Sequence, residues 1–269
     1  MCEMEKDMRR STLISLIAAG TLAATAAGIF AWRRFDSRTY LRYDTMFGTA
    51  RVYQVEDDQG TLVRLLEVGG IVQSGTYLDE RYTELVFEYL KRYDLMFESE
   101  KPISRICVLG CGGYDYPEHL IAHHPDVTVD AVEIDPSITA IAQLHFFLDR
   151  LSEEFDTESP GRLNLIWSDA LDHLRTTETL YDAIVNDTYD AGAPPAHLTT
   201  PAYAQAVHDR LTPGGLYLTN IVSAIEGPGS AFLHEQVDIL KGLFTDVRII
   251  ACDPDNLTSE DNVIVTARK

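Results

Sequence analysis

The chain has few basic residues for its length. It carries 22 lysines and arginines against 42 aspartates and glutamates, which gives 269 residues a formal net charge of −20. Binding to nucleic-acid phosphates needs a surplus of cationic side chains, and the lysines and arginines here form no stripe. We therefore expect no nucleic-acid partner, whereas a cationic substrate is compatible with the acidic composition.

Cysteines are also scarce, and internal repeats and low-complexity tracts are absent. The four cysteines form no CxxC pair and are scattered through expected strands and loops: Cys2, Cys107, Cys111 and Cys252. This pattern favours reduced thiols over a disulfide framework, and we expect no metal site. With 45% hydrophobic residues, the chain is long enough for one sizeable core with an appendage.

Charge is missing altogether from residues 11–32. Arg9 and Arg10 precede this stretch and Arg33 and Arg34 follow it, and its length suffices to cross a bilayer. We favour an uncleaved membrane anchor over the alternative, a cleaved export signal of the twin-arginine kind. The arginines after the stretch favour a cytoplasmic location for the rest of the chain.

The residues after this stretch predict a small β segment and then a helix. Residues 50–56 and 61–68 alternate apolar and polar side chains on either side of a DDQG turn, as in a hairpin. Apolar residues recur at helical spacing from Asp79 to Phe97. The expected organisation is a tail (1–10), a transmembrane helix or signal anchor (11–32), a linker (33–48), an N-terminal β segment (49–78) and a catalytic domain (79–269).

The catalytic domain alternates strands and helices. Five apolar segments, ICVLG, VTVDAVEID, RLNLIWSD, YDAIVND and GGLYLTNIV, predict a parallel sheet with helices on both faces. Two closing strands, VRIIACD and NVIVTAR, predict an antiparallel finish. We therefore expect an α/β fold with a Rossmann-like sheet of the S-adenosylmethionine-methyltransferase type.

The first of these strands leads into a glycine-rich turn. Gly110, Gly112 and Gly113 follow an apolar run, so the backbone there can turn tightly and approach a ligand closely. Glu133 ends the next strand, 23 residues after Gly110. An acid at about this spacing can accept both ribose hydroxyls, so the pattern predicts a nucleoside site.

Other acids follow later strands. Asp169 could accept from an adenine amino group or cap the following helix, and the sequence leaves both open. Asp187 and Asp190 lie where a strand gives way to a loop rich in Ala, Gly and Pro. Such acids are common in turns, but carboxylates at a binding edge can also hold an ammonium or remove its proton.

Four motifs together resemble one family. Asp187 and Asp190, in DTYDA, fall in register with the acids of the motif DSSDP. Gln73 and Tyr82 match the pattern QxxxxxxxxYQE, while VEID at 132–135 and SDA at 168–170 match two further motifs. Over roughly residues 50–265 the chain resembles the spermidine synthases, a family of aminopropyltransferases.

The resemblance implies a transfer of an aminopropyl group from decarboxylated S-adenosylmethionine to a polyamine such as putrescine. Asp187 would be the general base, Asp190 would bind the far end of the polyamine and Tyr82 would contact the amine. The residues implied or expected to hold the nucleoside cofactor are Gln73, Gly110, Gly112, Asp115, Glu133 and Asp169.

The glycine loop departs from the family pattern. Gly113 stands where the family has the acid that receives the aminopropyl ammonium, and Asp115 is the candidate to replace that acid. Two alternatives stay open because of this departure: an S-adenosylmethionine-dependent methyltransferase, and a nucleoside- or polyamine-binding protein without turnover. The sequence also leaves open which amine is used and whether the chain forms a homodimer.

Overall fold

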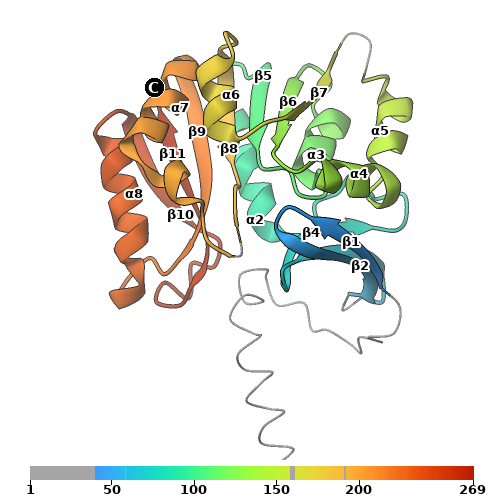
Figure 1. Cartoon of the computed structure of the whole chain (residues 1–269). Coiled ribbons are helices and arrows are strands. Elements are labelled where there is room, and N and C mark those ends of the chain that lie inside the picture. Colours follow the sequence, from blue (N-terminus) through green and yellow to red (C-terminus); the bar gives the residue numbers. More distant parts are fainter. Residues whose placement is uncertain (1–39, 58, 158–160, 191) are drawn as a thin grey trace, which may run out of the picture.

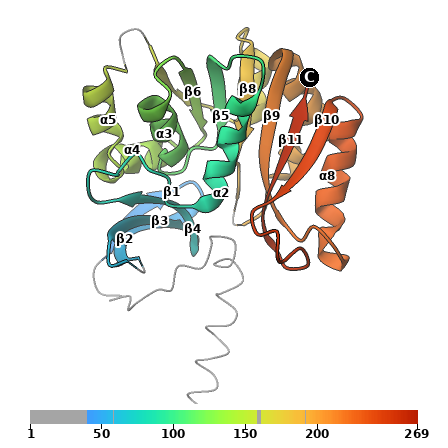
Figure 2. The same ribbon diagram turned by 180° about the vertical axis from the view of Figure 1, so that it is seen from behind.

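The computed structural model describes residues 40–57, 59–157, 161–190 and 192–269. They form a four-stranded antiparallel sheet and a seven-stranded mixed sheet, with the smaller sheet below the larger one in Figures 1 and 2. The expected transmembrane segment, residues 11–32, lies outside the described residues. Within them, no helix combines the length and the apolar character needed to cross a bilayer.

The small sheet begins earlier than the sequence indicated. Its strands follow each other in chain order, β1 (Leu41–Thr45), β2 (Gly48–Glu56), β3 (Leu62–Val68) and β4 (Ile71–Tyr77). The first strand falls within the expected linker 33–48, so that boundary is wrong. Residues 41–45 pair antiparallel with β2. The Tyr43 hydroxyl also lies 2.5 Å from His145 Nε2, and the Met46 amide donates to Asp135 at 2.6 Å.

The helix expected over residues 79–97 forms only in its second half. Turns occupy the segment after β4, and regular structure starts with the single turn α2 (Glu88–Lys91), followed by the 3₁₀ helix η1 (Arg92–Glu98). Leu85, Val86 and Phe87 are consecutive and all buried. An α-helix directs consecutive side chains to different faces, so the extended backbone at Phe87 is the way to bury all three.

The seven-stranded sheet confirms the expected α/β class. Its order is β10-β11-β9-β8-β5-β6-β7, with parallel pairing from β9 to β7 and antiparallel pairing of β11 with both β9 and β10. The strands are β5 (Arg105–Leu109), β6 (Thr128–Glu133), β7 (Leu163–Trp167), β8 (Tyr181–Asn186), β9 (Leu211–Ser223), β10 (Thr245–Ala251) and β11 (Asp261–Arg268).

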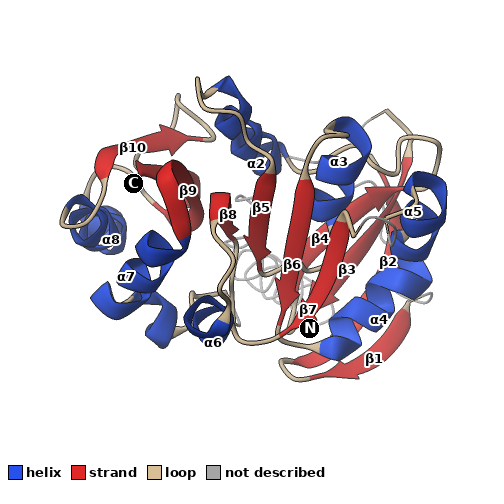
Figure 3. Ribbon diagram, turned by 90° about the horizontal axis from the view of Figure 1, so that it is seen from above, coloured by secondary structure: helices blue, strands red, loops and turns tan. Residues whose placement is uncertain are grey.

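Helices cover both faces of this sheet, as expected (Figure 3). One face packs against α3 (Asp115–His123), α4 (Pro136–His145) and α5 (Leu148–Phe155), and the other against α6 (Ala170–Thr176), α7 (Pro201–Arg210) and α8 (Ala231–Lys241). Short 3₁₀ turns, η2 (Ala196–Thr199) and η3 (Pro228–Ser230), complete the second face. Two side-chain caps explain helix starts: Asp135 accepts from Ser137 N before α4, and Asp169 caps α6.

Strand β5 shows how the core is divided. Ile106 and Val108 belong to the cluster on the α3 side, whereas Cys107 and Leu109 belong to the cluster on the α6–α8 side. All four are buried, because alternate residues of a strand point to opposite faces and helices cover both. The described cysteines Cys107, Cys111 and Cys252 are free thiols.

The strand order reverses at β5, which lies between β6 and β8. Ligands of such sheets bind outside the carboxyl ends of the strands at this switch point. Strand β4 of the small sheet closes the same edge, because Ser74 Oγ accepts from Gly113 N at 2.5 Å and Gly75 N donates to Asp115 Oδ2 at 2.9 Å. The fold therefore places the glycine loop between the two sheets.

Candidate active site

Two cavities, each of about 390 Å³, meet at the carboxyl edge of the large sheet. The first lies over β6 and the loops after β7 and β8, and the second lies between β4, α2, η1 and the start of α3. Both are lined by five common residues: Gln73, Gly110, Gly112, Asp187 and Tyr189. The two cavities therefore adjoin at these residues.

Gly110 separates the strand from the loop and must lack a side chain. Its φ is +80°, and a Cβ at this position would lie 2.5 Å from the carbonyl oxygen of Asp187. No side chain fits at that distance, so glycine lets the ends of β5 and β8 lie side by side at the junction of the cavities. The backbone thus brings Asp187 to the place that the sequence predicted.

Glu133 points into the first cavity and is held by backbone donors. Its Oε2 accepts from Cys111 N at 3.1 Å and its Oε1 accepts from Asp135 N at 3.0 Å. Burial raises the pKa of this carboxyl, and the backbone hydrogen bonds oppose the rise. The oxygens keep further lone pairs for hydroxyl donors, which suits the expected contact with a ribose.

Asp169 also lines the first cavity, and it caps helix α6, which is one of the two roles that the sequence left open. Its Oδ1 accepts from Leu171 N and Asp172 N, and its Oδ2 accepts from His197 Nε2 at 2.8 Å. Burial would raise the pKa of Asp169, but these hydrogen bonds outweigh burial and lower it. Asp169 is therefore fixed and charged, and its carboxylate keeps acceptor capacity for one further donor, such as the expected adenine amino group.

Asp187 stands at the junction of the cavities, at the carboxyl end of β8. Tyr89 Oη donates to its Oδ2 at 3.0 Å, and Asn220 Nδ2 donates to its Oδ1 at 3.0 Å. Burial raises the pKa of Asp187, although the hydrogen bonds from Asn220, Tyr89 and Tyr93 oppose this. A carboxyl with a raised pKa is a stronger proton acceptor than an exposed aspartate.

Asp115 lines the second cavity, and the geometry explains why Gly113 carries no acid. A Cβ on Gly113 would lie 2.8 Å from Ser74 Cβ and 3.0 Å from both Asp115 Oδ1 and Phe146 Cδ1. There is no room for an aspartate at 113 in this loop. Burial raises the pKa of Asp115 to about 7, against hydrogen bonds from the Gly75 backbone and Ser74.

The second cavity combines aromatic rings with carboxylates. Tyr89, Tyr93 and Tyr116 line it, and Tyr93 packs edge-on against Tyr116 with ring centroids 5.1 Å apart. Aromatic faces attract cations, and acidic side chains pair with them. Besides Asp115 and Asp187, the exposed Glu260 contributes to the lining, so acidic groups and aromatic faces suited to cationic ligands surround this cavity.

Two residues of the expected site lie elsewhere. Tyr82 lines neither cavity: its hydroxyl donates to Glu154 at 2.8 Å, and the Arg150 guanidinium lies 4.2 Å from the centre of its ring. The structure therefore does not bring Tyr82 to either cavity, and its contact with an amine stays a prediction from the resemblance. The turns after β4 direct Tyr82 to α5, and α2 brings Tyr89 to Asp187 instead.

Asp190 lies in the first cavity and not in the second. Its backbone pairs with Ala193 in a tight turn, at 2.8 and 2.9 Å, and its side chain is exposed. The turn separates the two acids that the sequence placed together. The expectation that Asp190 binds the far end of an amine beside Asp187 is therefore not supported, because of these two acids only Asp187 lines the second cavity.

Sequence reasoning missed several residues of the site. Tyr89 and Tyr93 were interpreted as the packed face of a helix, because their spacing is helical. Asn220 could have been found from the strand order: Thr219 pairs with Asn186, so the next residue lies beside Asp187. His197 comes from the short 3₁₀ turn η2 and Glu260 from a loop, and no spacing rule identifies them.

Comparisons with known proteins agree with this geometry. The family model for the spermine/spermidine synthase domain matches residues 95–234. A probable polyamine aminopropyl transferase of Bifidobacterium longum is 23% identical over 191 residues, which are 71% of this chain and 39% of that protein. The human eEF1A lysine and N-terminal methyltransferase is 24% identical over 183 residues, or 61% of this chain and 25% of that protein.

The fold is also shared with a solved structure. A probable spermidine synthase from Corynebacterium glutamicum superposes with a TM-score of 0.71 at 20% identity, over 86% of this chain and 80% of that chain. At this identity the likeness establishes the fold alone. The chain spans about two fifths of the first curated relative and a quarter of the second, so their activities carry over only as proposals.

Proposed function

The chain belongs to the spermine/spermidine synthase family, and we propose on that premise that it is an aminopropyltransferase acting on a polyamine. One observation carries the proposal: two separate cavities share Asp187 at their junction. A transfer between two small molecules needs two adjoining sites with a proton acceptor between them. A methyltransferase for a large substrate would need the first site and an open surface.

The first cavity would hold the nucleoside of decarboxylated S-adenosylmethionine. Glu133 accepts the ribose hydroxyls, oriented by the Cys111 and Asp135 amides, and Ile134 and Ile138 offer apolar contact. Gly110 and Gly112 allow the sulfonium to approach the junction. The donor's aminopropyl ammonium would bind to Asp115, because the loop has no room for an acid at position 113.

The second cavity would hold the acceptor amine. A primary amine is mostly protonated near neutrality, with a pKa of about 10.4, and must lose a proton before it can attack. Asp187 takes this proton while Tyr89 and Asn220 hold the carboxylate in place. The nitrogen then bonds to the methylene beside the sulfonium, the carbon–sulfur bond breaks, and neutral methylthioadenosine leaves.

A second candidate is methyl transfer from S-adenosylmethionine to an amine. It is favoured by one observation, the absence of the family's loop acid at Gly113, because that acid favours the decarboxylated donor. The first cavity and Asp187 would serve both reactions. The two candidates therefore differ in the donor and in the group transferred.

The test is to incubate the purified protein with each donor in turn and with putrescine, and to identify the products by mass spectrometry. Aminopropyl transfer gives a longer polyamine and methylthioadenosine. A methylated amine would establish the second candidate. Nucleoside binding without any product would instead identify a binding protein, the remaining alternative from the sequence.

We also propose that residues 11–32 anchor the protein in a membrane with the catalytic domain in the cytoplasm, where the nucleoside donor is made. The uncharged stretch and the arginines after it support this. Fractionation of cells with a C-terminal tag tests the proposal. Full-length protein in the membrane fraction is expected, and a shorter, exported and soluble form would contradict it.

A further inference from the structure

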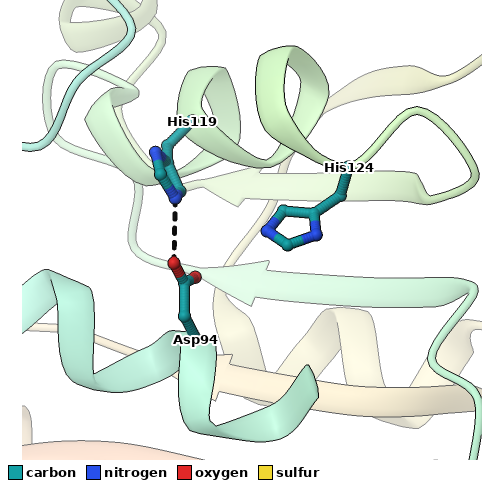
Figure 4. Close-up of side chains that lie close together, drawn as sticks. All are labelled: Asp94, His119 and His124. Carbon is teal, nitrogen blue, oxygen red and sulfur yellow. Dashed lines mark hydrogen bonds and ion pairs between the residues drawn. The ribbon is translucent and has the colours of Figure 1, made fainter. Parts of the chain in front are cut away.

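We propose that Asp94, His119 and His124 bind one divalent transition-metal ion, such as Zn²⁺, outside the active site (Figure 4). Each residue offers one ligand atom, and these atoms all lie within 4.8 Å of one another. Asp94 comes from η1, His119 from α3, and His124 follows the last residue of α3. The site would therefore bridge two elements that are distant in sequence.

The end of α3 explains how two histidines five positions apart converge. His124 has left the helix, with φ of −126° and ψ of 81°. Its ring stacks on Phe97, with ring centroids 3.7 Å apart and planes at 9°. The stack holds the imidazole beside η1, so its position does not depend on an ion.

His119 is oriented as metal-bound histidines are. Its Nδ1 lies 3.3 Å from the carbonyl oxygen of Thr83 and its Nε2 lies 3.0 Å from Asp94 Oδ2. When Nδ1–H donates to the carbonyl, the lone pair of Nε2 faces a carboxylate oxygen. Two facing lone pairs need a shared cation, and a backbone acceptor on the other nitrogen is the usual outer support of a histidine ligand.

Asp94 has the matching support. Its second oxygen, Oδ1, accepts from the Tyr116 hydroxyl at 3.0 Å, which leaves Oδ2 directed at His119. Its side chain is 34% exposed and that of His119 is 12% exposed, so an ion could enter from solvent. All three ligands are thus held in position by contacts outside the set, as a preorganised site requires.

The donor set selects the class of ion. Two imidazoles and one carboxylate suit Zn²⁺ and its neighbours, whereas Mg²⁺ and Ca²⁺ prefer sites built from oxygen. Three protein ligands leave a fourth position for water. The lack of a CxxC pair predicts no metal site, but it carries no information about ligands that the fold brings together from η1 and the C-terminal part of α3.

An ion here would fix one wall of the second cavity. Tyr93 precedes Asp94 in η1, and Asp115 is the first residue of α3. Tyr116 links α3 to η1, because its hydroxyl donates to Asp94. Tyr93, Asp115 and Tyr116 all line the cavity. An ion that binds only the folded state stabilises that state. A bound metal ion would therefore hold η1 against α3, whichever reaction the enzyme catalyses.

The test uses the purified full-length chain, stripped with a chelator and titrated with ZnCl₂ or with CoCl₂ as a spectroscopic probe. We expect one ion per chain by elemental analysis, a visible Co²⁺ absorption of tetrahedral character and a higher melting temperature with Zn²⁺. His124→Ala and Asp94→Asn should each weaken binding by at least about 100-fold, more than loss of an outer support costs.

Three controls separate the site from other causes. Tyr116→Phe keeps all three ligands and should weaken Zn²⁺ binding by about 10-fold. His234→Ala, on exposed α8, should change nothing. Circular dichroism without metal shows whether each variant is folded. Binding that is absent, exceeds one ion, or is equally strong in folded His124→Ala would overturn the proposal and leave a proton as the cation between His119 and Asp94.

Discussion

The two cavities hold their carboxylates in different ways. In the first, Asp169 accepts from the backbone amides of Leu171 and Asp172. Glu133 accepts from the backbone amides of Asp135 and, in the glycine loop, Cys111. In the second, Asp187 accepts from side chains 98 and 33 positions away in sequence, those of Tyr89 and Asn220. The acids of the first cavity are thus held mainly by backbone amides, with His197 as an added donor to Asp169, whereas Asp187 is held by tertiary packing.

The acids of the site also differ in the direction in which their pKa values are shifted. Backbone donors and His197 hold the pKa of Asp169 below its usual range, so that acid stays charged. Burial raises the pKa of both Asp187 and Asp115, so these acids gain and lose protons more readily. Burial raises the pKa of Glu133 as well, so of these four acids only Asp169 has a lowered pKa. A carboxyl with a raised pKa at the junction of the cavities suits removal of a proton from an amine.

The largest expected effect concerns Asp187. Asp187→Asn keeps size and hydrogen bonding but cannot accept a proton, so turnover should fall by about 10²- to 10⁴-fold. Nucleoside affinity should stay close to that of the wild type. Steady-state kinetics with calorimetric binding of methylthioadenosine measure both, and Asp190→Asn is the matched control.

The pH dependence sharpens this prediction. Because burial raises the pKa of Asp187 above the usual 3.8, the wild-type rate should fall on acidification at a higher pH than an exposed aspartate would give. Asp187→Asn should lack this step. An Asp187→Asn rate equal to the wild-type rate across pH would place the base elsewhere.

A smaller effect is expected for Glu133. Glu133→Gln retains the shape of the side chain but removes the charge from its hydrogen bonds, which are worth about 1.5–3 kcal/mol when charged. Affinity for methylthioadenosine should drop about 10- to 100-fold, while the amine concentration needed for half-maximal rate should barely change. Unaltered nucleoside affinity would remove Glu133 from the first cavity's function.

Asp115 should make the free energy of unfolding depend on pH. Its pKa is raised from 3.8 in the unfolded chain to about 7 in the folded protein. Between these values the folded state binds more protons, so the free energy of unfolding should decrease as pH rises through this window. Urea denaturation of Asp115→Asn at the same pH values should show a weaker decrease.

Ligand binding tests the same group in the opposite direction. An ammonium beside Asp115 favours its charged form, so binding of a cationic ligand near pH 7 should release protons, up to about one per chain. At a pH equal to the pKa only half of the Asp115 carboxyls carry a proton, so the release should be about half a proton per chain near pH 7 and approach one near pH 6. Calorimetry in two buffers of different ionisation enthalpy measures this release. Identical apparent enthalpies in both buffers would show that no ammonium reaches Asp115.

The smallest expected effect compares Glu260 with Asp190. Glu260 lines the second cavity from an exposed position, and exposed ion pairs contribute about 0.2–1 kcal/mol. Glu260→Gln should therefore raise the KM for the amine by roughly two- to five-fold, with kcat unchanged. Asp190→Asn and the exposed Glu178→Gln should leave KM unaltered, and a larger effect from Asp190 would restore the original assignment from sequence.

What the sequence predicted follows the same division. The positions of the glycine loop, Glu133 and Asp187 could be predicted because each lies at the end of a strand, and strand ends share one edge of a parallel sheet. The parallel sheet was predicted from the alternation of strands and helices, and its antiparallel finish from the two closing strands. These features depend on short stretches of chain and on the general rules of α/β sheets.

The failures involve contacts between distant segments. Tyr82 and Tyr89 are both tyrosines near the end of the small sheet, and only the turns after β4 decide which one reaches Asp187. Asp190 follows Asp187 by three residues, yet a two-residue backbone pairing with Ala193 turns it to the other cavity. Motif spacing carries no information about such turns, and helical periodicity did not reveal the buried run at Leu85–Phe87.

The position of Asp187 between the cavities has a consequence for the order of events. A donor with a cationic sulfonium would lower the pKa of this shared carboxyl and repel an ammonium, so it favours the neutral, reactive form of the acceptor. By reciprocity of linked binding, the acceptor acts equally on the donor. Once the sulfonium has become a neutral thioether, that repulsion disappears and the cationic product binds more tightly. Inhibition by the product amine should therefore be strongest while methylthioadenosine remains bound.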